Sequence, residues 1–284
     1  MQPKHVWQFW EDGSPPDCVL PVISLMQRVN PTWSWNMLSA RAVEFELLPL
    51  VEQHVPNVSQ AYKCIHGAFP QARSDFVRYA ALLVHGGVWL DVKSSATVTL
   101  DDIFGGEEDS KVAHFSTQAL APRPHTLLTW ACAAPTGHPA LRRILRTMTD
   151  AMLDWHGDID ASGKSAVLWL TGPRLLTRAL DCRPASSASA SPTCKAEGIK
   201  LHQQDFEGRL IYDATVANPK RFTLHVEDKN MNGALAATRP PMTVGSCYRN
   251  SSSRAQYQRA VEAVRTAECR TWLKQQRAQA GKVK

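Results

Sequence analysis

The sequence predicts an α/β fold from three observations. Segments with strand-like and helix-like hydrophobic patterns alternate between residues 5 and 92. The clearest unit is a helix over 75–85, a Gly-Gly pair that ends it, and a strand over 88–92. A length of 284 residues and a hydrophobic fraction of 44% are typical of a globular protein with a substantial core. We expect one domain over residues 1–250 and a basic helix over 251–284.

The individual elements follow from hydrophobic periodicity and from the residues that interrupt it. Strands are expected at 5–10, 33–38, 88–92, 210–212 and 222–226, and a β-prone or mixed segment at 126–134. Helices are expected at 19–29, 42–54, 75–85, 138–155 and 173–180. The Ser74 hydroxyl is predicted to cap the 75–85 helix by accepting a backbone N–H.

The net charge of +6 is concentrated at the C-terminal end. Eight basic and two acidic residues follow residue 250, so residues 1–250 are neutral overall. A neutral domain argues against a nucleic-acid partner. The basic tail is expected to be a solvated helix face, with contact to a membrane surface as the alternative.

The N-terminus shows no basic-then-apolar leader, and no apolar run reaches the length of a membrane span. As it stands the sequence predicts a cytoplasmic protein, or a protein of the Golgi or secretory lumen if an anchor precedes it. The seven cysteines include no C-x-x-C pair. Cys182 and Cys194 flank a Pro-, Ser- and Ala-rich stretch at 183–193, and an oxidising compartment would allow them to form a disulfide.

Three polar residues accompany the helix-Gly-Gly-strand unit. Asp75 and Arg78 are three residues apart on one side of the helix, and Asp91 lies where the following strand ends. Open α/β sheets bind ligands at such strand ends. Two carboxylates and a guanidinium suit a sugar, because carboxylates accept from hydroxyls and a guanidinium donates to hydroxyls or phosphates. The alternative is a local Asp75–Arg78 ion pair and an Asp91 that only begins a turn.

The same segment resembles a known family of enzymes. Ser74-Asp75-Phe-Val-Arg78-Tyr79 and Gly86-Gly87-Val-Trp-Leu90-Asp91 are similar to the core pattern of glycosyltransferases with a DXD-type sugar-binding region. That family includes fungal Golgi mannosyltransferases and capsular polysaccharide synthesis enzymes, and clostridial glucosylating toxins are more distant. Further matching segments occur in the family's order at 4–10, 30–33, 97–103 and 171–173.

The resemblance implies a GT-A-like, Rossmann-type nucleotide-sugar-binding domain with added helices. It implies transfer of a hexose from a UDP- or GDP-sugar to a glycan, lipid or protein acceptor, with retention of configuration. The residues implied in donor binding are Trp10, Asp75, Arg78, Tyr79, Gly86, Gly87 and Asp91. Trp10 would stack on the nucleobase; a core aromatic is the alternative.

The second acidic position of the motif is Lys93 in this chain. An ammonium has no acceptor and does not coordinate Mn²⁺ or Mg²⁺. We interpret Asp91 and Lys93 as the catalytic pair, and three alternatives remain open for their chemistry. Lys93 itself neutralises the leaving diphosphate, or a metal persists on Asp91 and a downstream ligand such as His225, or the site binds sugar without turnover.

A different class of enzyme is the competing interpretation. Asp91-Val92-Lys93 matches the D-x-K of PD-(D/E)xK nucleases, in which the acidic residues bind Mg²⁺ and the lysine positions water. The neutral domain and an upstream Asp75 that begins a helix both argue against it. A non-catalytic sugar-binding relative is the third possibility.

Overall fold

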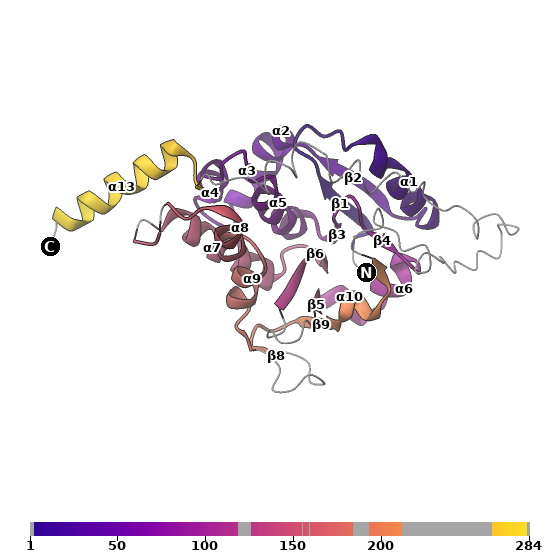
Figure 1. Cartoon of the computed structure of the whole chain (residues 1–284). Helices are drawn as coiled ribbons and strands as arrows, with labels where there is room; N and C mark the ends of the chain where they lie inside the picture. Colours follow the sequence, from indigo (N-terminus) through magenta and orange to yellow (C-terminus); the bar gives the residue numbers. More distant parts are fainter. Residues whose placement is uncertain are drawn as a thin grey trace, which may run out of the picture.

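The computed structural model describes residues 3–118, 126–154, 156–158, 160–183, 193–211 and 263–282. Its centre is a six-stranded mixed sheet with the order β2-β1-β3-β6-β5-β9 (Figure 1). The strands are β1 (His5–Phe9), β2 (Ser34–Leu38), β3 (Gly87–Leu90), β5 (Ala113–Gln118), β6 (Thr126–Ala134) and β9 (Ile199–Gln203). β1 is parallel to β2 and β3, β6 is antiparallel to β3 and β5, and β5 is parallel to β9.

Helices cover this sheet, and the predicted α/β class is therefore confirmed. They are α1 (Leu20–Val29), α2 (Ala40–Ala42), α3 (Leu48–Glu52), α4 (Val58–Lys63), α5 (Pro70–His85), α6 (Leu100–Phe104), α7 (Pro139–Leu153), α8 (Gly163–Leu170), α9 (Pro173–Ala179), α10 (Gln204–Glu207) and α13 (Ala267–Lys282). A π-helical segment, Val43–Leu47, joins α2 to α3. Two small antiparallel pairs consist of β4 (Ser95–Ala96) with β10 (Leu210–Ile211), and β7 (Cys182–Arg183) with β8 (Thr193–Cys194).

The two faces of the sheet bury different sets of residues. Side chains alternate along a strand, so Trp7 and Trp89 belong to one core cluster while Val6 and Val88 belong to another. The first cluster includes residues from α3, α4, α5, α7, α8 and α9, and the second includes residues from α1 and α6. The central strands are therefore buried on both faces, as expected for an α/β sheet.

The helix that carries the candidate site begins earlier than predicted. α5 starts at Pro70, and Ser74 lies inside it, so the expected Ser74 cap is wrong. Proline is suited to the first helical turn because its φ is already helical and its missing N–H has no partner there. Asp75 consequently lies in the second turn and does not begin the helix.

Two disulfides connect distant parts of the fold. Cys182–Cys194 joins β7 to β8, which realises the pairing considered from the sequence. Cys64–Cys269 joins the end of α4 to α13 across 205 residues and was not predicted. α13 extends from the body at the end of the described chain (Figure 1). In the part of the chain that the structure describes, none of the helices combines the length and the apolar character of a bilayer span.

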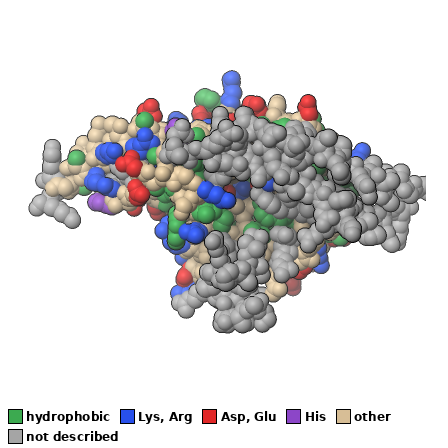
Figure 2. Space-filling model, viewed as in Figure 1, with side chains coloured by type: hydrophobic (Ala, Val, Ile, Leu, Met, Phe, Trp, Pro, Cys, Tyr) green, Lys and Arg blue, Asp and Glu red, His purple; other side chains and the backbone are tan. Residues whose placement is uncertain are grey.

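The predicted strand at 222–226 and the candidate ligand His225 lie outside the described residues. The expected boundary between the domain and its C-terminal helix, at residue 250, also falls outside them. The described part of that helix runs over Ala267–Lys282. Figure 2 shows Lys and Arg side chains interspersed with acidic ones at the left of the molecule, where α13 lies.

Candidate functional site

Arg78 lies between two carboxylates at the carboxyl end of β3. Its Nη1 donates to Asp75 Oδ1 at 2.5 Å, and its Nη2 donates to Asp91 Oδ1 at 3.1 Å. Trp89 Nε1 donates to the same Asp91 oxygen at 3.1 Å. The Thr171 hydroxyl donates to Asp75 Oδ2 at 3.3 Å. We call Asp75, Arg78, Trp89, Asp91 and Thr171 the acidic cluster.

The chain brings these residues together through the reversal between α5 and β3. Gly86 and Gly87 have φ values of 67° and 100°, which L side chains rarely adopt. A Cβ on Gly87 would also lie 2.4 Å from the His5 carbonyl oxygen. These glycines allow β3 to run back beside α5, so that Asp91 reaches the level of Asp75. They lie at the opposite end of β3 from Asp91, and the structure does not bring them to the acidic cluster.

Burial and charge pairing oppose each other in the acidic cluster. Burial raises the pKa of Asp75 to about 6, against the opposing effect of Arg78 and the Thr171 hydroxyl. The two neighbouring carboxylates outweigh burial at Arg78 and raise the pKa of its guanidinium. The side chain of Asp91 is 25% exposed, compared with 3% for Arg78. Asp91 is therefore the member of the cluster that a ligand reaches most directly.

The other predicted site residues occupy different surroundings. Tyr79 is fully buried, with its ring centre 5.9 Å from the Arg78 guanidinium carbon, so it packs beneath the cluster. Trp10 is half-buried and packs against the small core group that contains Val92. Lys93 is buried, in a turn in which Ser94 N donates to the Asp91 carbonyl at 2.8 Å. Lys93 thus lies in the segment that follows β3, and Trp10 packs against that segment.

The described residues around Asp91 do not fit a divalent cation. Asp91 Oδ1 already accepts from a guanidinium and an indole, and the second motif position carries an ammonium. A divalent cation bound by carboxylates needs several oxygen ligands. Among the described residues no group of three or more His, Cys, Asp or Glu side chains is arranged to hold one.

Two members of the cluster were not assigned a role from the sequence. Trp89 is the aromatic residue between Gly87 and Asp91, and its indole N–H fixes the Asp91 carboxylate. Thr171 opens the Thr-Gly-Pro segment before α9, almost a hundred residues after Asp75 along the chain. The motif match indicated that both segments matter, but it did not indicate which side chains touch.

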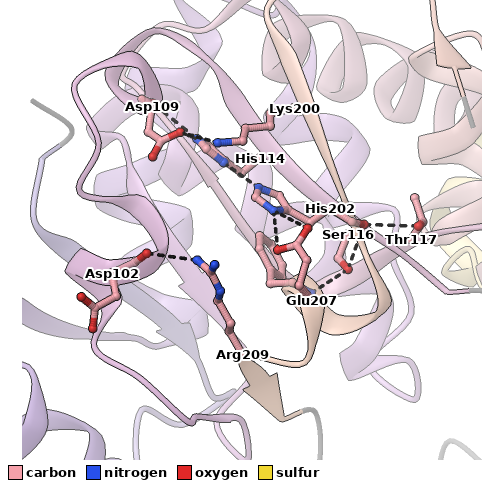
Figure 3. A network of polar contacts seen from close by, with 10 residues as sticks. Asp102, Asp109, His114, Ser116, Thr117, Lys200, His202, Glu207 and Arg209 are labelled. Carbon is pink, nitrogen blue, oxygen red and sulfur yellow. Dashed lines mark hydrogen bonds and ion pairs between the residues drawn. The ribbon is translucent and has the colours of Figure 1, made fainter. Parts of the chain in front are cut away.

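A second polar network lies between β5, β9 and α10, on the sheet face that α6 covers (Figure 3). Its histidines and Asp109 are buried, whereas the side chains of Lys200 and Glu207 are 52% and 49% exposed. His114 Nδ1 and His202 Nε2 are 2.9 Å apart, and both oxygens of Glu207 lie 3.2 Å from His202 Nδ1. His114 Nε2 lies 3.6 Å from Asp109 Oδ1, which accepts from Lys200 at 3.0 Å. We call these five residues the histidine network. No sequence motif indicated this network, because its members are spread over nearly a hundred residues.

Comparisons with known proteins match the part of the chain that contains Asp75, Arg78 and Asp91. Residues 15–108 match the family model described as a glycosyltransferase sugar-binding region containing a DXD motif. The chain is 25% identical over 164 residues to the putative glycosyltransferase HOC1 of Saccharomyces cerevisiae, covering 53% of this chain and 40% of that protein. It is 26% identical over 193 residues to an initiation-specific alpha-1,6-mannosyltransferase of Schizosaccharomyces pombe, covering 63% and 48%. The chain thus spans less than half the length of these curated relatives.

Solved structures with a related arrangement include the PaToxG glycosyltransferase, with a TM-score of 0.47 and 15% identity, covering 62% of this chain and 68% of that one. The UDP-bound glycosyltransferase domain of the YGT toxin has a TM-score of 0.45 and 9% identity, covering 63% and 77%. The matched sequence region contains Asp75, Arg78 and Asp91. Residues 15–108 of this chain are therefore similar in sequence to the glycosyltransferase sugar-binding region that contains a DXD motif.

Proposed function

We propose that this protein is a glycosyltransferase that moves a hexose from a nucleoside-diphosphate sugar to a glycan acceptor. The observation that carries the proposal is the buried arrangement of Asp75, Arg78 and Asp91 at the carboxyl end of β3, inside the matched region. Ligands bind at this edge of α/β sheets. The names of the relatives support mannose as the transferred sugar.

In the proposed reaction Asp91 accepts hydroxyl hydrogens of the donor, and Arg78 holds both carboxylates in position. The bond between the anomeric carbon and the diphosphate oxygen breaks, and its electron pair stays on the diphosphate. The acceptor hydroxyl passes its proton to an oxygen of the departing diphosphate and forms the new bond to the anomeric carbon on the same face, so that the configuration is retained. A preorganised, water-poor site stabilises such a change in charge more than water does. Trp10, which packs beside the segment after β3, is proposed to stack on the nucleobase.

Lys93 is proposed to replace part of the charge that a metal supplies in relatives with an aspartate at this position. It is buried two residues after Asp91, where the motif places the second carboxylate. A fixed ammonium stabilises a departing diphosphate by direct charge neutralisation. Transfer that continues in the presence of a chelator would support this role, and complete loss with chelator would contradict it.

The nuclease alternative is not favoured by the geometry. Asp91-Val92-Lys93 lies in a turn after β3, whereas that chemistry requires the D-x-K on a strand. The upstream Asp75 lies inside a helix and is already paired with Arg78. The sequence relatives are named as glycosyltransferases.

Maturation in an oxidising compartment is part of the proposal. Two disulfides, Cys64–Cys269 and Cys182–Cys194, are formed in the structure, and such bonds persist outside the reducing cytosol. This supports a secretory location over the cytoplasmic one expected from the sequence as it stands. Thiol titration of the purified native protein would give fewer reactive thiols before reduction than after it.

The proposed function is tested by incubating the pure protein with UDP- and GDP-sugars and measuring released nucleotide, with Mn²⁺ and separately with chelator. Release from one donor supports a glycosyltransferase and identifies that donor. If no donor is hydrolysed but one stabilises the protein in a thermal shift assay, the protein is a non-catalytic sugar-binding relative. If no donor is hydrolysed or bound, the proposal is overturned.

A further inference from the structure

A pocket of about 560 Å³ lies along α8, outside the acidic cluster. One side of it is a single face of α8, because Ser162, Ser165, Ala166, Trp169 and Leu170 recur at helical spacing. The opposite side comes from the end of α7, the segment that follows α7, and α9. Its charged lining residues are Asp154, Asp158, Asp160, Arg178 and Arg265. The volume is in the range of pockets that bind small molecules.

Trp169 provides the pocket with an accessible aromatic surface. It is 48% exposed, although tryptophan is usually among the more buried residues. The guanidinium carbon of Arg174 lies 5.0 Å from its ring centre, which orients the indole. A flat, oriented and solvent-facing indole is suited to the apolar C–H face of a pyranose ring.

The opposite wall is rigid and rich in hydrogen-bond acceptors. Arg265 donates to the carbonyls of Ala151, Met152 and Asp158 at 2.6, 2.9 and 2.6 Å, respectively. Arg265 thereby connects the segment after α7, through Asp158, to the last turn of α7. The Asp158 side chain accepts from the Asp160 backbone N–H at 3.1 Å and keeps further acceptor capacity.

The C-terminal helix reinforces the same wall. Arg270 and Lys274 of α13 pair with Asp160, each at 3.4 Å. Cys269, the residue immediately before Arg270, is disulfide-bonded to Cys64. The basic helix is thus anchored on the segment that lines the pocket, and the remaining charged groups of the lining are Asp154, Asp158, Arg178 and Arg265.

The pocket also adjoins the acidic cluster through α8. Leu170 lines the pocket, and the next residue, Thr171, donates to Asp75. The wall of the pocket and the acidic cluster are therefore connected by two consecutive residues at the end of α8. An acceptor of glycosyl transfer has to occupy such a neighbouring position.

We infer that this pocket binds a neutral oligosaccharide as the acceptor, an inference that rests on the proposed function. The aromatic surface and the acceptor-rich wall match the apolar face and the hydroxyls of a neutral sugar. With Asp160 paired to α13, the remaining aspartates of the lining are balanced by Arg178 and Arg265, so the pocket carries little net charge and favours a neutral ligand.

The test compares two exposed tryptophans, with α-1,6-mannobiose as the acceptor probe. Trp169→Ala is expected to raise KM for mannobiose at least about tenfold. A change of this size corresponds to the loss of roughly one aromatic contact. Trp169→Phe should restore most of the affinity because it returns an aromatic surface. Trp272→Ala is the matched control, since Trp272 is 36% exposed on α13 and does not line the pocket. An unchanged KM in Trp169→Ala would overturn the inference.

A binding measurement separates this inference from the proposed function. The indole N–H signal of Trp169 is assigned by its loss in Trp169→Ala and followed by NMR while mannobiose is added. A saturable shift in the native protein supports the pocket even if no donor is hydrolysed. Donor hydrolysis without any shift of this signal overturns the pocket and leaves the proposed function standing.

Discussion

The acidic cluster and the histidine network are both polar, but they differ in how their buried groups are partnered. The exposed members of the histidine network are Lys200 and Glu207, whose side chains are 52% and 49% exposed. In the histidine network, His202 contacts His114 through one ring nitrogen and Glu207 through the other. His114 is likewise contacted at both nitrogens. In the acidic cluster, the contacts to Asp91 described above both reach Oδ1, and a quarter of the side chain is exposed.

The difference teaches how a binding network can be distinguished from a structural one. Paired histidines whose ring nitrogens already have partners satisfy one another, as buried polar groups generally do. Two carboxylates held by one guanidinium retain acceptor capacity, and here they lie at the ligand-binding edge of the sheet. The two regions should consequently respond differently to substitution and to pH.

Removing the cation from the acidic cluster should have the largest effect. Arg78→Met leaves Asp75 and Asp91 without their common partner in a buried site. Loss of one partner from a buried ion pair costs about 3–5 kcal/mol of unfolding free energy. Urea denaturation would measure this loss, and a change below about 1 kcal/mol would contradict the proposed role of Arg78 in holding the cluster.

Asp91→Asn should remove activity while keeping the fold. The amide cannot accept as two charged oxygens do, so donor hydrolysis should fall by at least about 100-fold. The melting temperature should stay close to that of the native protein, because Asp91 is the most exposed carboxylate of the cluster. Asp12→Asn, an exposed residue whose side chain accepts from Ser14 N, is the control. Full activity in Asp91→Asn would contradict the assignment of this cluster as the donor site.

The pH dependence of donor binding should follow Asp75. Its pKa is raised to about 6 by burial, so the carboxylate is protonated below that pH. Because a folded-state pKa above the ordinary value favours the protonated form, the contribution of Asp75 to stability is present below about pH 4 and is lost as pH rises through 6. KM for the donor should rise as pH falls below 6. Asp75→Asn should flatten that rise, and an identical pH profile in the variant would show that another group controls it.

The sequence predicted individual helices, strands and turns better than the tertiary contacts between them. The Gly86-Gly87 reversal and the strand before Asp91 followed from glycine chemistry and periodicity, and both are confirmed. The start of α5 was wrong because Ser74 fitted a cap, while the stronger constraint was Pro70 four residues earlier. Contacts between residues distant in sequence, such as Thr171 with Asp75, depend on how helices pack. No periodicity encodes them.

The smallest effect is expected in the histidine network. The contribution of His114 to stability changes with pH in the direction opposite to that of Asp75. Burial and the neighbouring His202 lower the pKa of His114 to about 4, so the folded state holds it neutral. A folded-state pKa below the ordinary value gives stability that is present above about pH 6.5 and is lost as pH falls through 4. His202→Gln removes one neighbour while keeping a polar side chain, and should cost about 1–2 kcal/mol of unfolding free energy at pH 7.

The urea midpoint of His202→Gln should fall less between pH 7 and pH 5 than the midpoint of the native protein, because His114 no longer faces a second imidazole. KM for the donor should not change, since the network lies on the sheet face that α6 covers, whereas α5, which carries Asp75 and Arg78, covers the other face. Urea midpoints at the two pH values and donor KM at pH 7 measure both expectations. A donor KM that rises with His202→Gln would mean that the two networks are coupled through the sheet, and that the division between a structural and a binding network is wrong.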